Sequence, residues 1–237
     1  MFHIAIINEA TSYKMPAAVI GALAKQVGDH FAPEWGTYAE LRQIAQPSDK
    51  MAGEWLLAIL DDSDQAGALG YHDLTTDGQP LGKVFARTTI QAGLNPTVTI
   101  SHELLEMLAD PDINLSCEID NPATGVPTRF YAREVCDACE DDTYAYGING
   151  VKVSDFVRRS WFIPGENKPY DYAGKIAAPL QLISGGYISL LNVATQGWTQ
   201  VDAERAPVHP NIRSLARLEK RNKPRAAWVR SEHAGVK

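Results

Sequence analysis

Cysteine is scarce in this chain, with three residues in 237. An odd and small number of thiols argues against a disulfide framework. The spacing of Cys136 and Cys139 is that of half a structural zinc site, which Cys117 and a histidine would complete. The second pair that makes such a pattern convincing is missing. We therefore interpret the three cysteines as incidental loop thiols.

Long apolar runs are also missing. No stretch of 18 apolar residues occurs, so the sequence predicts no spanning helix and no membrane partner. Residues 1–8 have neither a basic n-region nor a small-residue cleavage site, and they read as a first buried strand. We expect a cytoplasmic protein. With 45% hydrophobic residues, the chain can bury a sizeable core.

Positive charge is concentrated at one end of an acidic chain. Residues 205–237 hold nine Lys or Arg and two Glu, a net charge of +7. Because the whole chain carries −7, residues 1–204 carry −14. We expect two parts: a domain over 1–204 and a basic, partly disordered tail over 205–237. The tail can contact nucleic acid or another polyanion, or it can simply be a solvated segment.

The most informative segment is 101–106, where an imidazole and two carboxylates follow one another closely. In a helix, His102 and Glu106 lie one turn apart on the same face, close enough to bind one metal ion. Glu103 points about 100° away, toward a metal-bound water. The pattern is that of the zinc-protease helix His-Glu-x-x-His, with glutamate in place of the second histidine. Zinc also accepts carboxylate oxygen. The alternative is an ordinary amphipathic helix with these three residues on its wet face.

The boundaries of this helix are well signalled. Asn95 is a suitable N-cap, and Pro96 suits the first helical position because its missing N–H costs nothing there. Pro111 ends the helix, so the sequence predicts a span of 96–110 with His102 near its middle.

A catalytic zinc needs a third protein ligand. We favour Asp137, since residues 137–140 interrupt strand alternation as a ligand loop does; Glu140, Glu134 and Asp112 remain open. Asp110 is expected either to contact the metal ligands without binding the metal itself or to cap the helix. A set with several carboxylates also suits Mn²⁺ or Fe²⁺.

The expected chemistry is hydrolysis. The metal polarises a carbonyl and lowers the pKa of its water toward about 7, and Glu103 takes the proton as general base. Tyr144 or Tyr146 is a candidate to stabilise the oxyanion. His72 either borders the cleft or, as we favour, is a surface or packing histidine.

Periodicity predicts an α/β (α+β) fold: a zincin-like mixed sheet with an active-site helix and a loop-rich C-terminal part. An edge strand precedes the helix that carries His102, as in zincins, where that strand holds the substrate backbone. The expected segments are strands 2–8, 36–44, 55–60 and 130–135, helix 16–31, a turn at 32–36, a hairpin-like pair 67–72 and 81–88, a turn-rich loop 119–127, and a short hairpin 147–153.

Seven motifs follow one another in a fixed order, at 32–36, 70–73, 78–80, 101–111, 134–137, 153–156 and 185–187. As a set they resemble a family of uncharacterised bacterial and phage-encoded proteins over about residues 3–190. The resemblance implies that His102, Glu103, Glu106 and Asp110 belong together, with Glu134, Asp137 and Glu140 as partners; it implies no particular activity. This chain departs from the family pattern at 138–139, where Ala and Cys stand.

The sequence therefore predicts a zinc-dependent peptidase or amide hydrolase that acts on a peptide or protein, with His102, Glu106 and Asp137 as metal ligands and Glu103 as base. One alternative is a non-catalytic phage structural or binding module, virion-associated, on the same fold. Another is a non-haem iron protein, which is disfavoured because the Glu-x-x-His order of helical di-iron bundles is absent.

Overall fold

A computed structural model describes residues 1–65, 68–121, 126–192, 195 and 197–203. The basic tail expected over 205–237 lies outside these residues, as does most of the middle of the loop expected at 119–127. Among the described helices, none combines the length and apolarity needed to cross a bilayer.

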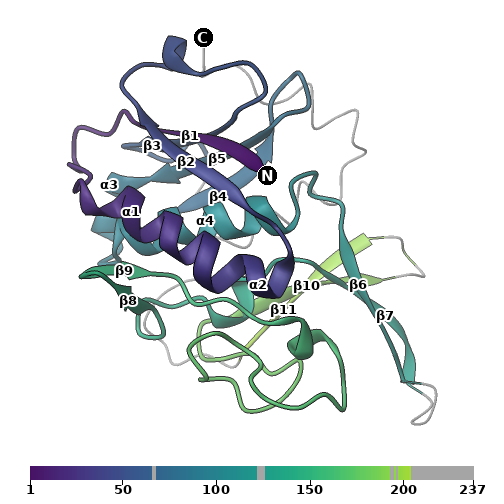
Figure 1. The fold of residues 1–237 in the computed structure, drawn as a ribbon. Helices are drawn as coiled ribbons and strands as arrows, with labels where there is room; N and C mark the ends of the chain where they lie inside the picture. The colour runs from purple at the N-terminus through teal and green to yellow at the C-terminus, as the bar shows by residue number, and fades with distance from the viewer. Residues whose placement is uncertain (66–67, 122–125, 193–194, 196, 204–237) are drawn as a thin grey trace.

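The larger of the two main sheets has five strands in the order β2-β1-β3-β5-β4 (Figure 1). Neighbouring strands in this order are parallel except for β4, which pairs antiparallel with β5 at one edge. The hairpin-like pair expected at 67–72 and 81–88 is present as antiparallel strands over 70–74 and 80–85, the first of them at the edge, whereas residues 86–88 belong to a short helix that precedes the site helix. The strands are β1 (Phe2–Asn8), β2 (Ala39–Ile44), β3 (Trp55–Leu60), β4 (Gly70–Leu74) and β5 (Pro80–Phe85).

Helices cover one face of this sheet. Side chains alternate between faces along a strand, so Ile4 and Ile6 join the main core with residues of α1 and α4, whereas Ala5 and Ile7 form a small separate cluster on the other face. The helical segments of this half are α1 (Ala18–Lys25), the π-helix η1 (Gln26–Phe31), α2 (Ala32–Trp35), the 3-10 helix η2 (Pro47–Asp49), α3 (Ala86–Gln91) and α4 (Pro96–Ala109).

The described residues after α4 are loop-rich, and some of them build a second, four-stranded sheet in the order β11-β10-β7-β6, which is visible below the first in Figure 1. The mixed α+β class and the loop-rich C-terminal part are confirmed. The elements are β6 (Ser116–Asn121), β7 (Val126–Ala132), η4 (Asp137–Cys139), β8 (Tyr146–Ile148), β9 (Val151–Val153), η5 (Arg159–Phe162), β10 (Tyr187–Asn192) and β11 (Gly197–Asp202).

Several segment predictions need correction. The turn expected at 32–36 is helical through Trp35 and ends at Gly36, whose φ of 75° closes the helix in the left-handed region. The helix therefore continues through η1 and α2, and the next strand begins only at Ala39. The strand expected at 130–135 ends at Ala132, and residues 133–136 leave the sheet. The hairpin turn at Asn149 and Gly150 is confirmed, with positive φ at both residues.

Candidate metal centre

The helix α4 forms where its end signals indicated. The Asn95 side chain accepts a hydrogen bond from the Thr97 N–H at 3.0 Å, and Pro96 occupies the first turn. Every residue of α4 is buried. The alternative of an amphipathic helix with His102, Glu103 and Glu106 on a wet face is therefore wrong.

A buried hydrogen-bond network holds the middle of α4 in place. The Ser101 hydroxyl donates to Gln26 Oε1 at 2.6 Å and accepts from the Ser154 N–H at 3.0 Å. Gln26 in turn donates to the Ser154 carbonyl at 2.8 Å. Three distant segments therefore meet beside His102, and the position of the helix relative to the chain around residue 154 is fixed.

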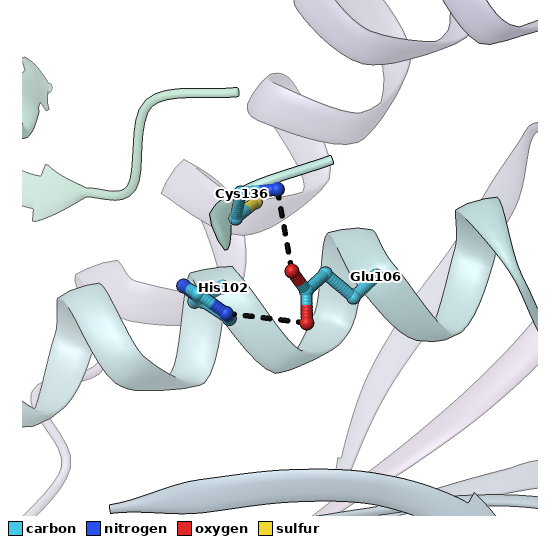
Figure 2. A group of neighbouring side chains, drawn as sticks. All are labelled: His102, Glu106 and Cys136. Carbon is cyan, nitrogen blue, oxygen red and sulfur yellow. Dashed lines mark hydrogen bonds and ion pairs between the residues drawn. The ribbon is translucent and has the colours of Figure 1, made fainter. Parts of the chain in front are cut away.

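His102 faces two carboxylates. Its Nε2 atom lies 3.2 Å from Glu106 Oε2, one turn along the helix (Figure 2), and 3.3 Å from Asp137 Oδ1. All three side chains are at most 1% exposed. Asp137, the first residue of η4, therefore reaches the imidazole as the sequence interpretation required.

Burial lowers the pKa of His102, but the adjacent carboxylates outweigh that effect. Glu106 and Asp137 together raise the pKa of the imidazole to about 10. The field in this part of the core thus strongly favours a positive charge.

Cys136 contributes to the same place. Figure 2 shows its backbone N–H directed at Glu106 Oε1, at 3.3 Å. His102, Glu106 and Cys136 offer ligand atoms that all lie within 4.8 Å of one another. Cys136 lies in the turn before η4, as expected for a loop thiol, but it is fully buried beside Glu106. Burial, followed by the Glu106 carboxylate, raises the pKa of this thiol well above its usual range, so Asp137 is the better anionic donor.

A second group of donors lies on the other side of Glu106. His72 Nδ1 lies 3.9 Å from Glu103 Oε2 and 3.8 Å from Glu106 Oε2, and His72 Nε2 lies 3.8 Å from Glu134 Oε2. His72 comes from β4 and is 2% exposed. Of the two alternatives favoured from the sequence, a surface histidine is excluded, and His72 is instead packed beside the glutamates of α4.

Gly70 permits this approach of the edge strand to the helix. A Cβ at this position would lie 2.8 Å from both Cγ and Oε1 of Glu103 and 2.9 Å from the Lys83 carbonyl oxygen. Only glycine therefore allows β4 to pack this closely against the Glu103 side chain.

Other candidates lie elsewhere or act differently. Asp110 caps the turn after α4, accepting from the Asn114 and Leu115 N–H groups. Asp112 is exposed and Glu140 is half-buried at the end of η4. Among the described residues, neither belongs to the two close groups of ligand atoms, and Asp137 stands outside them as well; its place beside the site depends on its 3.3 Å contact with His102 Nε2.

The two tyrosines proposed for the oxyanion are not gathered at these groups. The Tyr146 hydroxyl accepts from Gln26 Nε2 at 3.1 Å and lies 3.1 Å from His30 Nδ1. Tyr144 packs half-buried against the main core. The structure gives neither residue an oxyanion role.

The spacing of the His102 group is compatible with a bound metal ion as well as with long hydrogen bonds. Charged N–H···O contacts are usually about 2.7–2.9 Å long. Ligand atoms about 2.1 Å from a tetrahedral zinc lie about 3.4 Å from one another. The distances of 3.2 and 3.3 Å from His102 Nε2 to Glu106 and Asp137 are close to that spacing.

No family model, curated protein or solved structure matches this chain. A functional assignment therefore depends on the residues themselves.

Proposed function

We propose that this protein is a metal-dependent hydrolase of peptide or related amide bonds. A divalent cation, zinc in the first instance, is held by His102, Glu106 and Asp137. The observation that supports this most strongly is the position of His102 Nε2, 3.2 and 3.3 Å from two carboxylate oxygens on different elements. One imidazole and two carboxylates are donors that zinc accepts, and Mn²⁺ or Fe²⁺ suits them as well.

A divalent cation in this position polarises a carbonyl oxygen and lowers the pKa of a water molecule toward about 7. Glu103 has the role of general base. It lies on the same helix, three residues before Glu106, and its Oε1 atom is directed at Gly70 of the edge strand β4. A carboxylate beside the strand that lines the substrate in zincin-like folds is placed to take a proton from water and return it to the leaving amine.

Complete burial of the donors supports a second candidate. His102, Glu103 and Glu106 are each 0% exposed. In a non-catalytic structural or binding module, a phage component for example, the cation would hold β4, α4 and the segment 134–137 together and no substrate would be cleaved. Both candidates require the metal, and they differ in whether a substrate is cleaved.

Metal analysis together with a peptide-library assay tests the proposal. We expect the purified chain to bind zinc or Mn²⁺ and to lose the cation of this site in H102A. The E103Q variant should keep the His102 cation and lose at least 100-fold in cleavage, the size typical of a missing general base. H3Q and E40Q, which alter an exposed His–Glu pair 3.2 Å apart, are the matched controls.

The outcomes separate the candidates. Metal binding without cleavage of any peptide in the library favours the non-catalytic role. A chain that folds but takes up no metal refutes both. The polyanion contact of the basic tail and a cytoplasmic or virion-associated location stay predictions from the sequence.

A further inference from the structure

Beside the His102 group lies a second set of donors that the proposed function does not use as ligands. His72, Glu103 and Glu106 offer ligand atoms that all lie within 4.8 Å of one another. Both sets contain Glu106, and the same atom, Oε2, faces His102 Nε2 at 3.2 Å and His72 Nδ1 at 3.8 Å. One carboxylate oxygen therefore lies between two imidazoles.

The distances between the ligand atoms of this second set match those between ligands of one bound cation. Contacts of 3.8 and 3.9 Å from His72 Nδ1 to the two glutamates are too long for hydrogen bonds. Two ligand atoms bound at about 2.2 Å, with an angle of about 120° between them, are about 3.8 Å apart. The separation therefore matches coordination of a shared ion.

Glu134 faces the other ring nitrogen of His72. When Nδ1 of an imidazole binds a metal, its other nitrogen carries the proton and usually donates to a carboxylate or carbonyl. His72 Nε2 faces Glu134 Oε2 at 3.8 Å. This separation is too long for a hydrogen bond, so Glu134 acts on the His72 ring through its negative charge, which favours the proton on Nε2 and leaves Nδ1 for a cation.

The charge of the whole cluster can accommodate more than one dication. Four carboxylates and two imidazoles are involved, and each is at most 2% exposed. With neutral imidazoles the formal charge is −4, so one divalent cation leaves −2 and two leave none. Burying uncompensated charge in a protein core is costly. The six side chains are His72, His102, Glu103, Glu106, Glu134 and Asp137.

We propose that the cluster is a dinuclear centre. One divalent cation binds His102, Glu106 and Asp137, and a second binds His72, Glu103 and Glu106, with the Glu106 carboxylate shared between them. The donors are mostly carboxylates, a set that suits harder cations such as Mn²⁺ and Fe²⁺ alongside zinc.

This inference rests on the proposed function and refines it. Glu103 binds the second cation through Oε2, the atom nearest His72, and keeps Oε1, which is directed at Gly70, for the proton from water. The two oxygens of one side chain thereby have separate roles. His72 becomes a ligand required by the reaction although it lies 30 residues before His102.

The test is a titration of the metal-free full chain with Mn²⁺ alone, read by metal analysis and by electron paramagnetic resonance. We expect two Mn²⁺ per chain and the spectrum of an exchange-coupled pair. H72Q should retain one Mn²⁺, with the six-line spectrum of an isolated ion. H3Q, at an exposed histidine, should retain both ions and the coupled spectrum.

Each result decides something different. One Mn²⁺ per wild-type chain, with an uncoupled spectrum, overturns the dinuclear centre and leaves the proposed function standing. No Mn²⁺ and no zinc overturns both. If H72Q does not fold, E134Q supplies the same comparison: loss of the negative charge that faces His72 Nε2 should weaken binding of only the second ion, by at least 10-fold. Equal weakening of both ions in E134Q, or of neither, contradicts the separate second position.

Discussion

His72 Nδ1 lies 3.8 Å from Glu106 Oε2, although one residue belongs to the edge strand β4 and the other to the helix α4. The pair links the sheet to the helix at the point where the buried donors meet. In the proposed centre, a cation would bind side chains from both elements and would add to the contacts that hold β4 against α4. The predictions below follow from that arrangement and from the residues around it.

Removal of the metal should destabilise the folded chain. A ligand that binds only the native state at 100 times its Kd contributes about 2.7 kcal/mol to stability. We expect a chelator to lower the unfolding midpoint of the wild-type chain in a thermal scan, and Mn²⁺ or zinc to restore it. H102A should show a much smaller response to either treatment. An identical chelator response in H102A would contradict binding at this position.

Asp137 and Cys136 compete for the role of third ligand beside His102, and isosteric variants separate them. D137N removes the carboxylate charge, so we expect it to lose the cation of that group. C136S removes a thiol whose pKa burial and Glu106 raise, and we expect it to keep the cation. Metal content after gel filtration measures both. Loss in C136S with retention in D137N would reverse the assignment.

Gly70→Ala should be destabilising. The added methyl would lie 2.8 Å from the Glu103 side chain, in a position that cannot relax without moving β4 or α4. Overpacking of this kind costs about 1–3 kcal/mol. Gly21→Ala in helix α1 is the matched control, since no atom lies within 4 Å of its Cβ position, and alanine should stabilise the helix by up to about 1 kcal/mol. Denaturant midpoints report both.

Asp155 should make stability fall as pH rises from about 4 to about 8. Burial, together with a hydrogen bond to the neighbouring Asp171, raises the pKa of Asp155 to about 8. Between the unfolded and folded pKa values the folded chain holds one proton more than the unfolded chain. Stability is therefore greatest below the unfolded pKa and declines by up to about 1.4 kcal/mol per pH unit.

The D155N variant should flatten this dependence. Asparagine keeps the acceptor that receives the Phe156 and Ala173 N–H groups and places a permanent donor toward Asp171. Urea unfolding at pH 5 and pH 8 measures the difference. An unchanged slope in D155N would show that other groups set the pH dependence.

Local signals in the sequence were sufficient to predict the helix that carries His102, Glu103 and Glu106. Asn95 and Pro96 set its start, and the four-residue interval between His102 and Glu106 brought their side chains within 3.2 Å of each other. Such short-range features depend on backbone geometry alone. The end was expected one residue late, at Asp110 instead of Ala109.

The remaining donors depend on tertiary packing. His72 is 30 residues before the helix on a strand whose two faces are both buried, so no alternation of polar and apolar residues revealed which way it pointed. The location of Cys136 beside Glu106 requires residues 133–136 to leave the second sheet. Gly70 was the one available signal, because glycine inside a strand often marks a close approach of another element.

The donors of the centre are contributed in order by residues 72, 102–106 and 134–137, with no segment supplying a complete set. During synthesis, a cation arriving before residue 137 has emerged from the ribosome would find only part of its shell. Loading of the proposed centre would therefore follow the docking of the edge strand and of the 134–137 segment on α4. In a cell short of the ion, the chain would remain less stable than its loaded form.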